Sequence, residues 1–228
     1  MPASALHELL HSVENASRAL GRPVRLLAVS KMQPADAVRA LAEQGQRAFG
    51  ENYVQEALGK REALAQIGLE WHLIGHLQSN KAADAARIFD WVQSADRLKL
   101  VDALARHRPG DAAPLQVLLQ VNIDDEASKH GCRPEDVFAL ADAVAAQPRL
   151  RLRGLMAIPA PAPDTTRRRT AFRAMKALFD TLAGQHPGVD TLSMGTSSDY
   201  LEAIEEGATM VRVGTALFGT RPPKEHNA

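Results

Sequence analysis

Short apolar runs and amphipathic stretches alternate along the chain. The clearest run, Leu26-Leu27-Ala28-Val29, places four apolar residues in a row and ends in Ser30 and Lys31. A continuous run of this length is typical of a strand buried on both faces, as in a parallel sheet. After Pro34, apolar residues recur at helical spacing and predict a helix. The pattern therefore begins with a strand followed by a helix.

The same alternation recurs eight times. The predicted strands cover residues 24–30, 47–50, 70–74, 90–93, 115–121, 150–158, 191–193 and 209–213. Helices are predicted between them, the longest at 165–184, and a further helix precedes the first strand. Eight such repeats without β-hairpin signals predict a single (β/α)8 barrel domain over residues 1–228. An open doubly wound sheet is the alternative, but Ser30-Lys31-Met32 is not the glycine-rich turn that it would need after the first strand.

The composition limits which partners and which cell compartment the protein can have, but it does not indicate a reaction. The 228 residues include 27 Lys or Arg and 27 Asp or Glu, so nothing indicates a nucleic acid or an anionic membrane as partner. A lone cysteine, Cys132, excludes an internal disulfide and favours a reducing compartment. The N-terminus lacks the apolar segment of a signal peptide, and no membrane span is predicted. We therefore expect a cytoplasmic protein. The basic triplet at 167–169 is interpreted as the solvated first turns of the long helix.

Lys31 stands where the first buried strand gives way to a helix. In barrel and open α/β folds this edge is where ligands bind and chemistry happens. A partly desolvated lysine at such an edge can lose its proton and attack a carbonyl. The alternative is a lysine that ends a strand and points to water, as most lysines do.

Two stretches near the C-terminus are rich in glycine and hydroxyl groups. Residues 193–198 (SMGTSS) follow the seventh strand, and Gly214-Thr215 follows the eighth at a helix start. Barrels often bind a phosphate with the loops after these two strands, because exposed backbone N–H groups, hydroxyls and a helix terminus converge there. Each stretch alone is also compatible with ordinary turns.

Arg212 precedes Gly214 by two residues and so shares its side of the pleat. Strands one and eight are neighbours in a closed barrel, which would place Lys31, Arg212 and the phosphate cradle in one mouth. Pyridoxal 5'-phosphate offers an aldehyde to the lysine, a phosphate to the cradle and a ring nitrogen to the arginine. A salt-bridged barrel arginine is the alternative interpretation of Arg212.

Several long motifs closely resemble those of the pyridoxal phosphate homeostasis protein family. They are LAVSK at 27–31, FGENYVQE at 49–56, WHLIG at 71–75, LQSNK at 77–81, QVN at 120–122, RGLMAIP at 153–159, LSMG at 192–195 and TMVRVGTALFG at 209–219. This resemblance runs over nearly the whole chain. It implies a barrel similar to the N-terminal domain of alanine racemase, called fold type III among proteins that bind this cofactor.

The resemblance also implies roles for single residues. It makes Lys31 the residue that forms the Schiff base and Arg212 the partner of the pyridine nitrogen. The residues expected to hold the phosphate are Ser193, Gly214 and Thr215, with Ser197 or Ser198. The pattern places Asn52 and His72 in the pocket lining, although a helix cap and a core histidine are their alternatives. His76 and Thr196 depart from the family, which often has proline and methionine there.

The arginine partner favours a carrier of the cofactor over a catalyst. A guanidinium keeps its proton, so the ring nitrogen opposite stays unprotonated and the ring is a weaker electron sink. Tyr53 and Tyr200 lie outside any racemase tyrosine motif, and we expect no second domain. The resemblance implies cofactor homeostasis that affects the balance of amino acids and keto acids. We also expect transient contact with apo-enzymes that use the cofactor, and a monomer or weak dimer. A minimal amino-acid racemase and a binder of another phosphate ligand are the alternatives.

Overall fold

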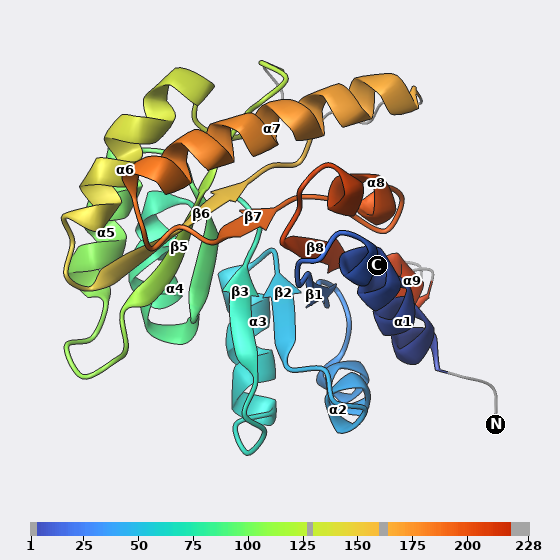
Figure 1. Cartoon of the computed structure of the whole chain (residues 1–228). Coiled ribbons are helices and arrows are strands. Elements are labelled where there is room, and N and C mark those ends of the chain that lie inside the picture. Colours follow the sequence, from blue (N-terminus) through green and yellow to red (C-terminus); the bar gives the residue numbers. More distant parts are fainter. Residues whose placement is uncertain (1–3, 127–129, 160–163, 220–228) are drawn as a thin grey trace, which may run out of the picture.

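The computed structural model describes residues 4–126, 130–159 and 164–219 and contains a closed barrel of eight parallel strands (Figure 1). The strands are β1 (Arg25–Val29), β2 (Ala48–Glu51), β3 (Glu70–Leu73), β4 (Trp91–Ala95), β5 (Leu115–Gln120), β6 (Leu150–Met156), β7 (Thr191–Ser193) and β8 (Met210–Val213). The ring closes where β1 pairs with β8, from Arg25 opposite Met210 to Ala28 opposite Val213. This closure confirms the predicted (β/α)8 barrel and excludes the open sheet.

Helices surround the barrel (Figure 1). They are α1 (Ala5–Ala19), α2 (Ala35–Glu43), α3 (Val54–Ala63), α4 (Ala82–Ile88), α5 (Leu98–His107), α6 (Val137–Ala145), α7 (Thr165–Gln185), α8 (Tyr200–Glu205) and α9 (Thr215–Phe218). Short 3-10 turns at Ser79–Lys81 and Pro134–Asp136 precede α4 and α6. In the described part of the chain, no helix combines the length and the apolar character needed to cross a membrane.

The predicted strands agree with the structure to within one residue at each end, apart from β6 and β4. The sixth strand was predicted to reach residue 158, but β6 ends at Met156. The predicted range of β4, 90–93, is two residues too short at the C-terminal end, because the strand continues to Ala95. A register shift between Val92 and Ala95 lets Ala95 pair with Leu119 of β5. Such a bulge leaves no hydrophobic signal of its own, so the pattern of apolar residues does not reveal it.

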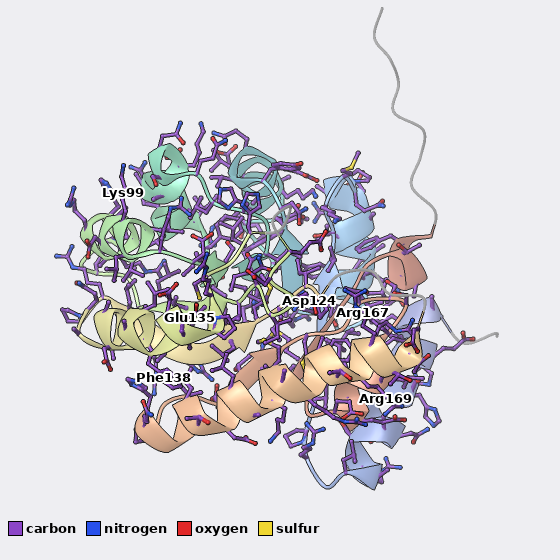
Figure 2. The ribbon with its side chains drawn as sticks, turned by 90° about the horizontal axis from the view of Figure 1, so that it is seen from above. Lys99, Asp124, Glu135, Phe138, Arg167 and Arg169 are labelled. Atoms are coloured by element: carbon purple, nitrogen blue, oxygen red, sulfur yellow. The ribbon has the colours of Figure 1, made fainter. Side chains whose placement is uncertain are left out.

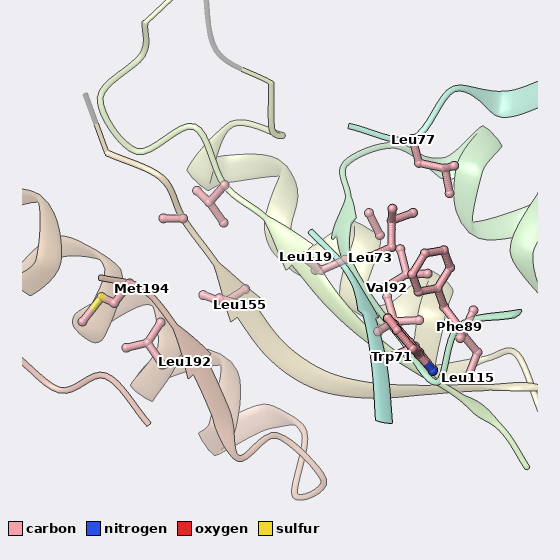
Figure 3. Packing of buried hydrophobic residues seen from close by; sticks show 14 of the residues in the cluster. Trp71, Leu73, Leu77, Phe89, Val92, Leu115, Leu119, Leu155, Leu192 and Met194 are labelled. Atoms are coloured by element: carbon pink, nitrogen blue, oxygen red, sulfur yellow. The ribbon is translucent and has the colours of Figure 1, made fainter. Parts of the chain in front are cut away.

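The main core lies between the outer face of the strands and the helices. Leu73, Val92 and Leu119 project from β3, β4 and β5 into this layer, where Phe89 and Leu77 pack (Figure 3). All five side chains are at most 1% exposed. Burying each such side chain contributes about 1.5–3 kcal/mol, so this layer supplies most of the driving force for folding.

The inside of the barrel holds less apolar material and more polar groups. One small cluster joins Leu27, Ala48, Ile74 and Met210, and another joins Trp91, Leu118 and Met156. Alternation along β1 turns Arg25, Leu27 and Val29 to the same inner side. The next residue on that side is Lys31, which reaches the end of the barrel where the strands terminate.

The basic triplet on α7 (Figure 2) is less solvated than the sequence interpretation held. Arg168 forms an ion pair with Glu202 at 2.9 Å, and Arg169 pairs with Glu206 at 2.9 Å and with Glu205. These arginines are only partly exposed, because α8 brings its acidic side against the first turns of α7. Arg168 and Arg169 therefore fasten α7 to the helix that follows the seventh strand, while Arg167 is exposed as expected.

Candidate functional site

A cavity of about 700 Å³ opens at the carboxyl end of the strands. Its lining comes from the ends of seven of the eight strands and the loops after them. The lining residues are Val29, Lys31, Gln33, Asn52, Ile74, Gly75, His76, Gln120, His130, Ile158, Thr196, Ser197, Ser198, Arg212, Gly214, Thr215, Phe218 and Gly219. Seven of the nine predicted site residues are thus on its wall, namely Lys31, Asn52, Ser197, Ser198, Arg212, Gly214 and Thr215.

Lys31 reaches the cavity from a tight turn at the end of β1. The N–H of Gln33 donates to the carbonyl of Ser30 at 3.0 Å, which closes a four-residue turn with Lys31 second and Met32 third. Met32 has a φ of 62°, the left-handed value that the third position of a type II turn requires. Glycine normally occupies that position, so the methionine holds a backbone conformation that costs about 1–3 kcal/mol.

Asn52 contributes to the wall beside Lys31. The cap of α3 is Tyr53, so the helix-cap alternative for Asn52 does not match the structure. Gly75, after β3, lies against the Asn52 backbone so closely that a Cβ at Gly75 would stand 2.2 Å from the Asn52 carbonyl oxygen. A residue with a side chain cannot occupy position 75 without moving Asn52.

The glycine and hydroxyl groups after β7 and β8 form one polar end of the cavity. The N–H of Gly214 donates to Ser197 Oγ at 3.2 Å, which joins the two loops. A Cβ at Gly214 would lie 3.0 Å from the carbonyl oxygen of Val29, so this glycine lets the ends of β1 and β8 approach each other. The Asp199 carboxylate accepts from both the N–H of Thr196, at 2.6 Å, and its hydroxyl, at 2.9 Å. Loop 196–199 is therefore held in shape by its own hydrogen bonds.

Arg212 is a buried cation at the cavity floor, with 3% of its surface exposed. Its guanidinium donates to Ser193 Oγ and to the Ala157 carbonyl, each at 2.7 Å. No carboxylate forms an ion pair with it within the described residues, which does not match the alternative of a salt-bridged barrel arginine. Burial lowers the pKa of Arg212 to about 10, against a smaller opposite effect of Asp199. The group stays charged at neutral pH, and within the described residues its counter-charge is Asp199, which acts on it without an ion pair.

Ser193 and His72 lie deeper than the sequence analysis expected, and neither is part of the cavity wall. Ser193 is opposite Met210 in the sheet, two residues below Arg212, so its hydroxyl lies beneath the guanidinium. His72 is fully buried inside the barrel and its ring stacks on Trp91, with 5.1 Å between the ring centroids. His72 therefore lies outside the residues that line the cavity, and its position matches the core-histidine alternative.

These two residues belong to a chain of hydrogen bonds through the barrel interior. Ser193 Oγ donates to Gln93 Oε1 at 2.7 Å, and Gln93 Nε2 lies 2.9 Å from His72 Nδ1. His72 Nε2 is 2.6 Å from Glu70 Oε1, which also accepts from Arg25 at 2.6 Å. Arg212 can only donate and the Glu70 carboxylate can only accept, so every link between them points the same way. His72 is accordingly neutral, with its proton on Nε2.

The pKa directions agree with this assignment. Burial lowers the pKa of His72, although the neighbouring Glu70 acts in the opposite direction. Burial alone would raise the pKa of Glu70, but hydrogen bonds and charges from His72 and Arg25 outweigh it and lower the pKa to about 2. The hydrogen-bond chain thus ends at the ionised carboxylate of Glu70, where the strands of the barrel begin.

Sequence reasoning missed one pair on the cavity wall. His76 and His130 stack with 3.7 Å between their ring centroids, and His76 Nδ1 lies 3.8 Å from Asp96. Burial lowers the pKa of His76, and the charge of His130 adds to the effect. His76 had drawn attention only as a departure from the family, and His130 comes from a polar loop far along the chain, so no local signal connects them.

Comparison with known proteins identifies the family. The family model described as the alanine racemase N-terminal domain matches residues 5–222. A pyridoxal phosphate homeostasis protein of Pseudomonas aeruginosa is 53% identical over 212 residues, covering 92% of this chain and 91% of its own. The protein of that name in Escherichia coli K12 is 47% identical over 225 residues, with 96% of both chains covered.

Solved structures agree with these relatives. PipY of Synechococcus elongatus PCC7942, solved without and with pyridoxal phosphate bound, is 37% identical with TM-scores of 0.86 and 0.82, covering 94% of this chain and 98% of its own. An alanine racemase of Clostridium difficile 630 has a TM-score of 0.71 at 16% identity, which shows the shared fold over 95% of this chain and 57% of its own. This chain therefore belongs to the alanine racemase N-terminal domain family and, within it, to the pyridoxal phosphate homeostasis proteins.

Proposed function

We propose that this protein binds pyridoxal 5'-phosphate in the cavity at the carboxyl end of the barrel. The observation that carries the proposal is the pairing of β1 with β8, because it brings Lys31 and the Gly214–Thr215 turn to adjoining strand ends. The buried guanidinium of Arg212 lies in the same cavity without a carboxylate partner among the described residues, and an electron-rich ring nitrogen fits it. The donor set thus suits the two ends and the ring of this cofactor.

Each residue has a distinct part in the proposed binding. Lys31 supplies the amine that bonds to the aldehyde carbon, with the aldehyde oxygen leaving as water. Gly214, Thr215 and Ser197 lie where backbone N–H and hydroxyl groups can donate to the phosphate. Arg212 can donate to the ring nitrogen and, because it keeps its proton, leaves that nitrogen unprotonated. When bound, the cofactor supplies an aldehyde that captures amines and a ring that withdraws electrons.

We further propose that the bound cofactor is stored and delivered rather than used for catalysis. The name of the bacterial relatives, pyridoxal phosphate homeostasis protein, supports this role. Neither tyrosine lines the cavity: Tyr53 is 64% exposed, and the Tyr200 hydroxyl bonds to Ser12 Oγ at 3.1 Å. The stacked pair His76 and His130 on the cavity wall offers imidazole groups that could act as the base of a racemase, so a racemase-like activity is the second candidate.

The storage role implies short-lived contact with apo-enzymes that accept the cofactor. We place the protein in the cytoplasm as a single unit spanning residues 1–228, acting as a monomer or weak dimer. The free thiol of Cys132 and the absence of a disulfide among the described residues are compatible with a reducing compartment.

The proposal is tested with one spectrum and one trapping reaction. Purified protein mixed with pyridoxal phosphate should absorb in the visible range, and borohydride should fix the cofactor on the peptide that contains Lys31. The variant Lys31→Ala should lose both signals, while Lys99→Ala on the exposed side of α5 (Figure 2) should keep them. A trapped adduct on another lysine would refute the assignment.

The racemase-like alternative requires a separate measurement. The protein loaded with cofactor is incubated with each L-amino acid in deuterated water, and the α-proton is followed by NMR. We expect no exchange at enzymatic rates. Steady loss of the α-proton that depends on Lys31 would replace the storage role with catalysis.

A further inference from the structure

The turn that carries Lys31 is fastened from beneath by three charged side chains. They are Glu51 at the end of β2, and Glu56 and Lys60 on α3; we call them the Lys60 cluster. Lys60 Nζ lies 2.7 Å from the Ser30 carbonyl, from Glu51 Oε1 and from Glu56 Oε1. An ammonium group has three N–H donors, so all three are used in this arrangement.

The cluster holds the peptide groups on both sides of Lys31. The Ser30 carbonyl, which belongs to the peptide before Lys31, accepts from Lys60, and the Ser30 hydroxyl donates to Glu51 at 2.5 Å. The N–H of Met32, which belongs to the peptide after Lys31, donates to Glu56. The orientation of Lys31 is therefore set by groups that lie outside the cavity wall.

Two features show that this contact is more than a surface ion pair. Lys60 is 6% exposed and Glu51 is fully buried, although a Glu56–Lys60 spacing of four residues on a helix commonly indicates a solvated pair. Burial raises the pKa of Glu51, against the opposing effects of Lys60 and Ser30. Burying charged groups this deeply costs desolvation free energy. Here these groups hydrogen-bond to the backbone of the turn that contains Met32 in its left-handed conformation.

We propose that Lys60 is a positioning residue for Lys31. Through Ser30 and, by way of Glu56, through Met32, it keeps the strained turn in the conformation that aims the Lys31 amine into the cavity. The proposal rests on the proposed function, in which Lys31 bonds to the aldehyde. Lys60 does not bond to the cofactor itself, because its three donors are engaged and it is not part of the cavity lining.

The test separates covalent capture from ordinary binding by using two ligands. Pyridoxal phosphate can bond to Lys31, whereas pyridoxamine phosphate carries an amine in place of the aldehyde and cannot. The variant Lys60→Met should weaken binding of pyridoxal phosphate and slow the appearance of visible absorbance by on the order of tenfold or more, since small misplacements of a reacting group are costly. Its affinity for pyridoxamine phosphate should stay within about twofold of wild type.

Matched variants keep the result interpretable. Lys99→Met removes an exposed lysine of α5 and should leave both ligands unaffected. If Lys60→Met fails to fold, Glu56→Ala tests the same point, because it removes the acceptor of the Met32 N–H from a partly exposed side chain. Glu56→Gln keeps an acceptor oxygen and should restore rapid capture.

Each further outcome has a defined meaning. If Lys60→Met lost the same affinity for both ligands, the Lys60 cluster would merely support the fold. If Lys60→Met captured pyridoxal phosphate as fast as wild type, the cluster would not position Lys31. Either result overturns the proposal. If wild-type protein itself gave no adduct on Lys31, the proposed function would fail instead. Normal trapping on Lys31 in wild type together with selective loss in Lys60→Met supports both.

Discussion

Replacing Gln93 with leucine removes the central link of the hydrogen-bond chain between Arg212 and Glu70. Gln93 is fully buried, accepts from Ser193 Oγ at 2.7 Å and lies 2.9 Å from His72 Nδ1. Leucine has a similar volume and no polar atoms, so the variant leaves no cavity. It leaves the Ser193 hydroxyl hydrogen and His72 Nδ1 buried without their partners.

The magnitude follows from those two groups. Each buried polar group left unsatisfied costs about 1–3 kcal/mol, and the buried leucine offsets about 1 kcal/mol of the total. We expect Gln93→Leu to lower the free energy of unfolding by about 1–5 kcal/mol, out of the roughly 5–15 kcal/mol typical of a domain. Ser193 also loses the acceptor that orients it toward Arg212, so the affinity for pyridoxal phosphate should fall by about five- to tenfold, or about 1 kcal/mol.

Urea unfolding of the cofactor-free protein measures the first effect, and titration followed by visible absorbance measures the second. Gln44→Leu is the control, because the Gln44 side chain is exposed at the end of α2 and its amide bonds only to the carbonyl of Ala40 in the described structure. If Gln93→Leu changed the free energy of unfolding by less than about 0.5 kcal/mol and left the affinity for pyridoxal phosphate unchanged, the hydrogen-bond chain would not orient Arg212.

Three further outcomes follow from the site. Gly214→Ala should weaken cofactor binding in the same titration, because its Cβ would lie 3.0 Å from the Val29 carbonyl oxygen, whereas Gly184→Ala in α7 meets nothing within 4 Å and should stabilise the protein by about 0.5–1 kcal/mol. Met32→Gly should raise the urea midpoint, since glycine adopts the φ of 62° without strain, and an unchanged or lower midpoint would contradict this. The free energy of unfolding should fall as pH drops below about 6.5, because His72 takes up a proton in the unfolded chain but not in the folded barrel. It should fall again from about pH 4.5 towards 2, because Glu70 is protonated there in the unfolded chain but stays ionised in the folded protein, and urea unfolding of Glu70→Gln should show a flatter pH dependence in this range.

The barrel itself was predictable because each strand leaves a local hydrophobic signal. Runs such as 26–29 are buried on both faces, and the alternation of strands with amphipathic helices limits the topology to very few choices. The loops after β7 and β8 were predictable for a similar reason, since glycine and hydroxyl residues at adjacent strand ends converge whenever the barrel closes. Placement in the cavity therefore followed from chain order for Lys31 and Gly214.

Depth inside the barrel was not predictable from spacing. Ser193 and His72 alternate correctly with their neighbours and do face inward, but how far each lies below the mouth depends on the stagger between strands. The register that sets Ser193 opposite Met210 places it two residues below Arg212. The depth of both residues below the cavity is therefore a property of strand pairing rather than of either residue.

Ion pairs between residues far apart in the sequence could not be predicted either, because they also depend on how the elements pack. Lys60 and Glu56 have the spacing of a solvated helix pair, and the triplet at 167–169 looks like a solvated helix start. Their surroundings are set by Glu51 on β2 and by the acidic residues of α8, which the sequence does not place nearby. A charge pattern on one helix cannot show which other element will cover it.

Arg212 and Lys31 are each held by a network whose other end lies outside the cavity. Arg212 forms no ion pair with a carboxylate among the described residues, yet its hydrogen-bond chain ends on Glu70, whose pKa of about 2 keeps that carboxylate charged at neutral pH. Lys31 is aimed by a turn that Lys60 secures. Both groups are thus oriented before any ligand arrives, which reduces the ordering cost of binding. Variants at Gln93 and Lys60 should consequently alter cofactor binding although neither residue touches the cavity.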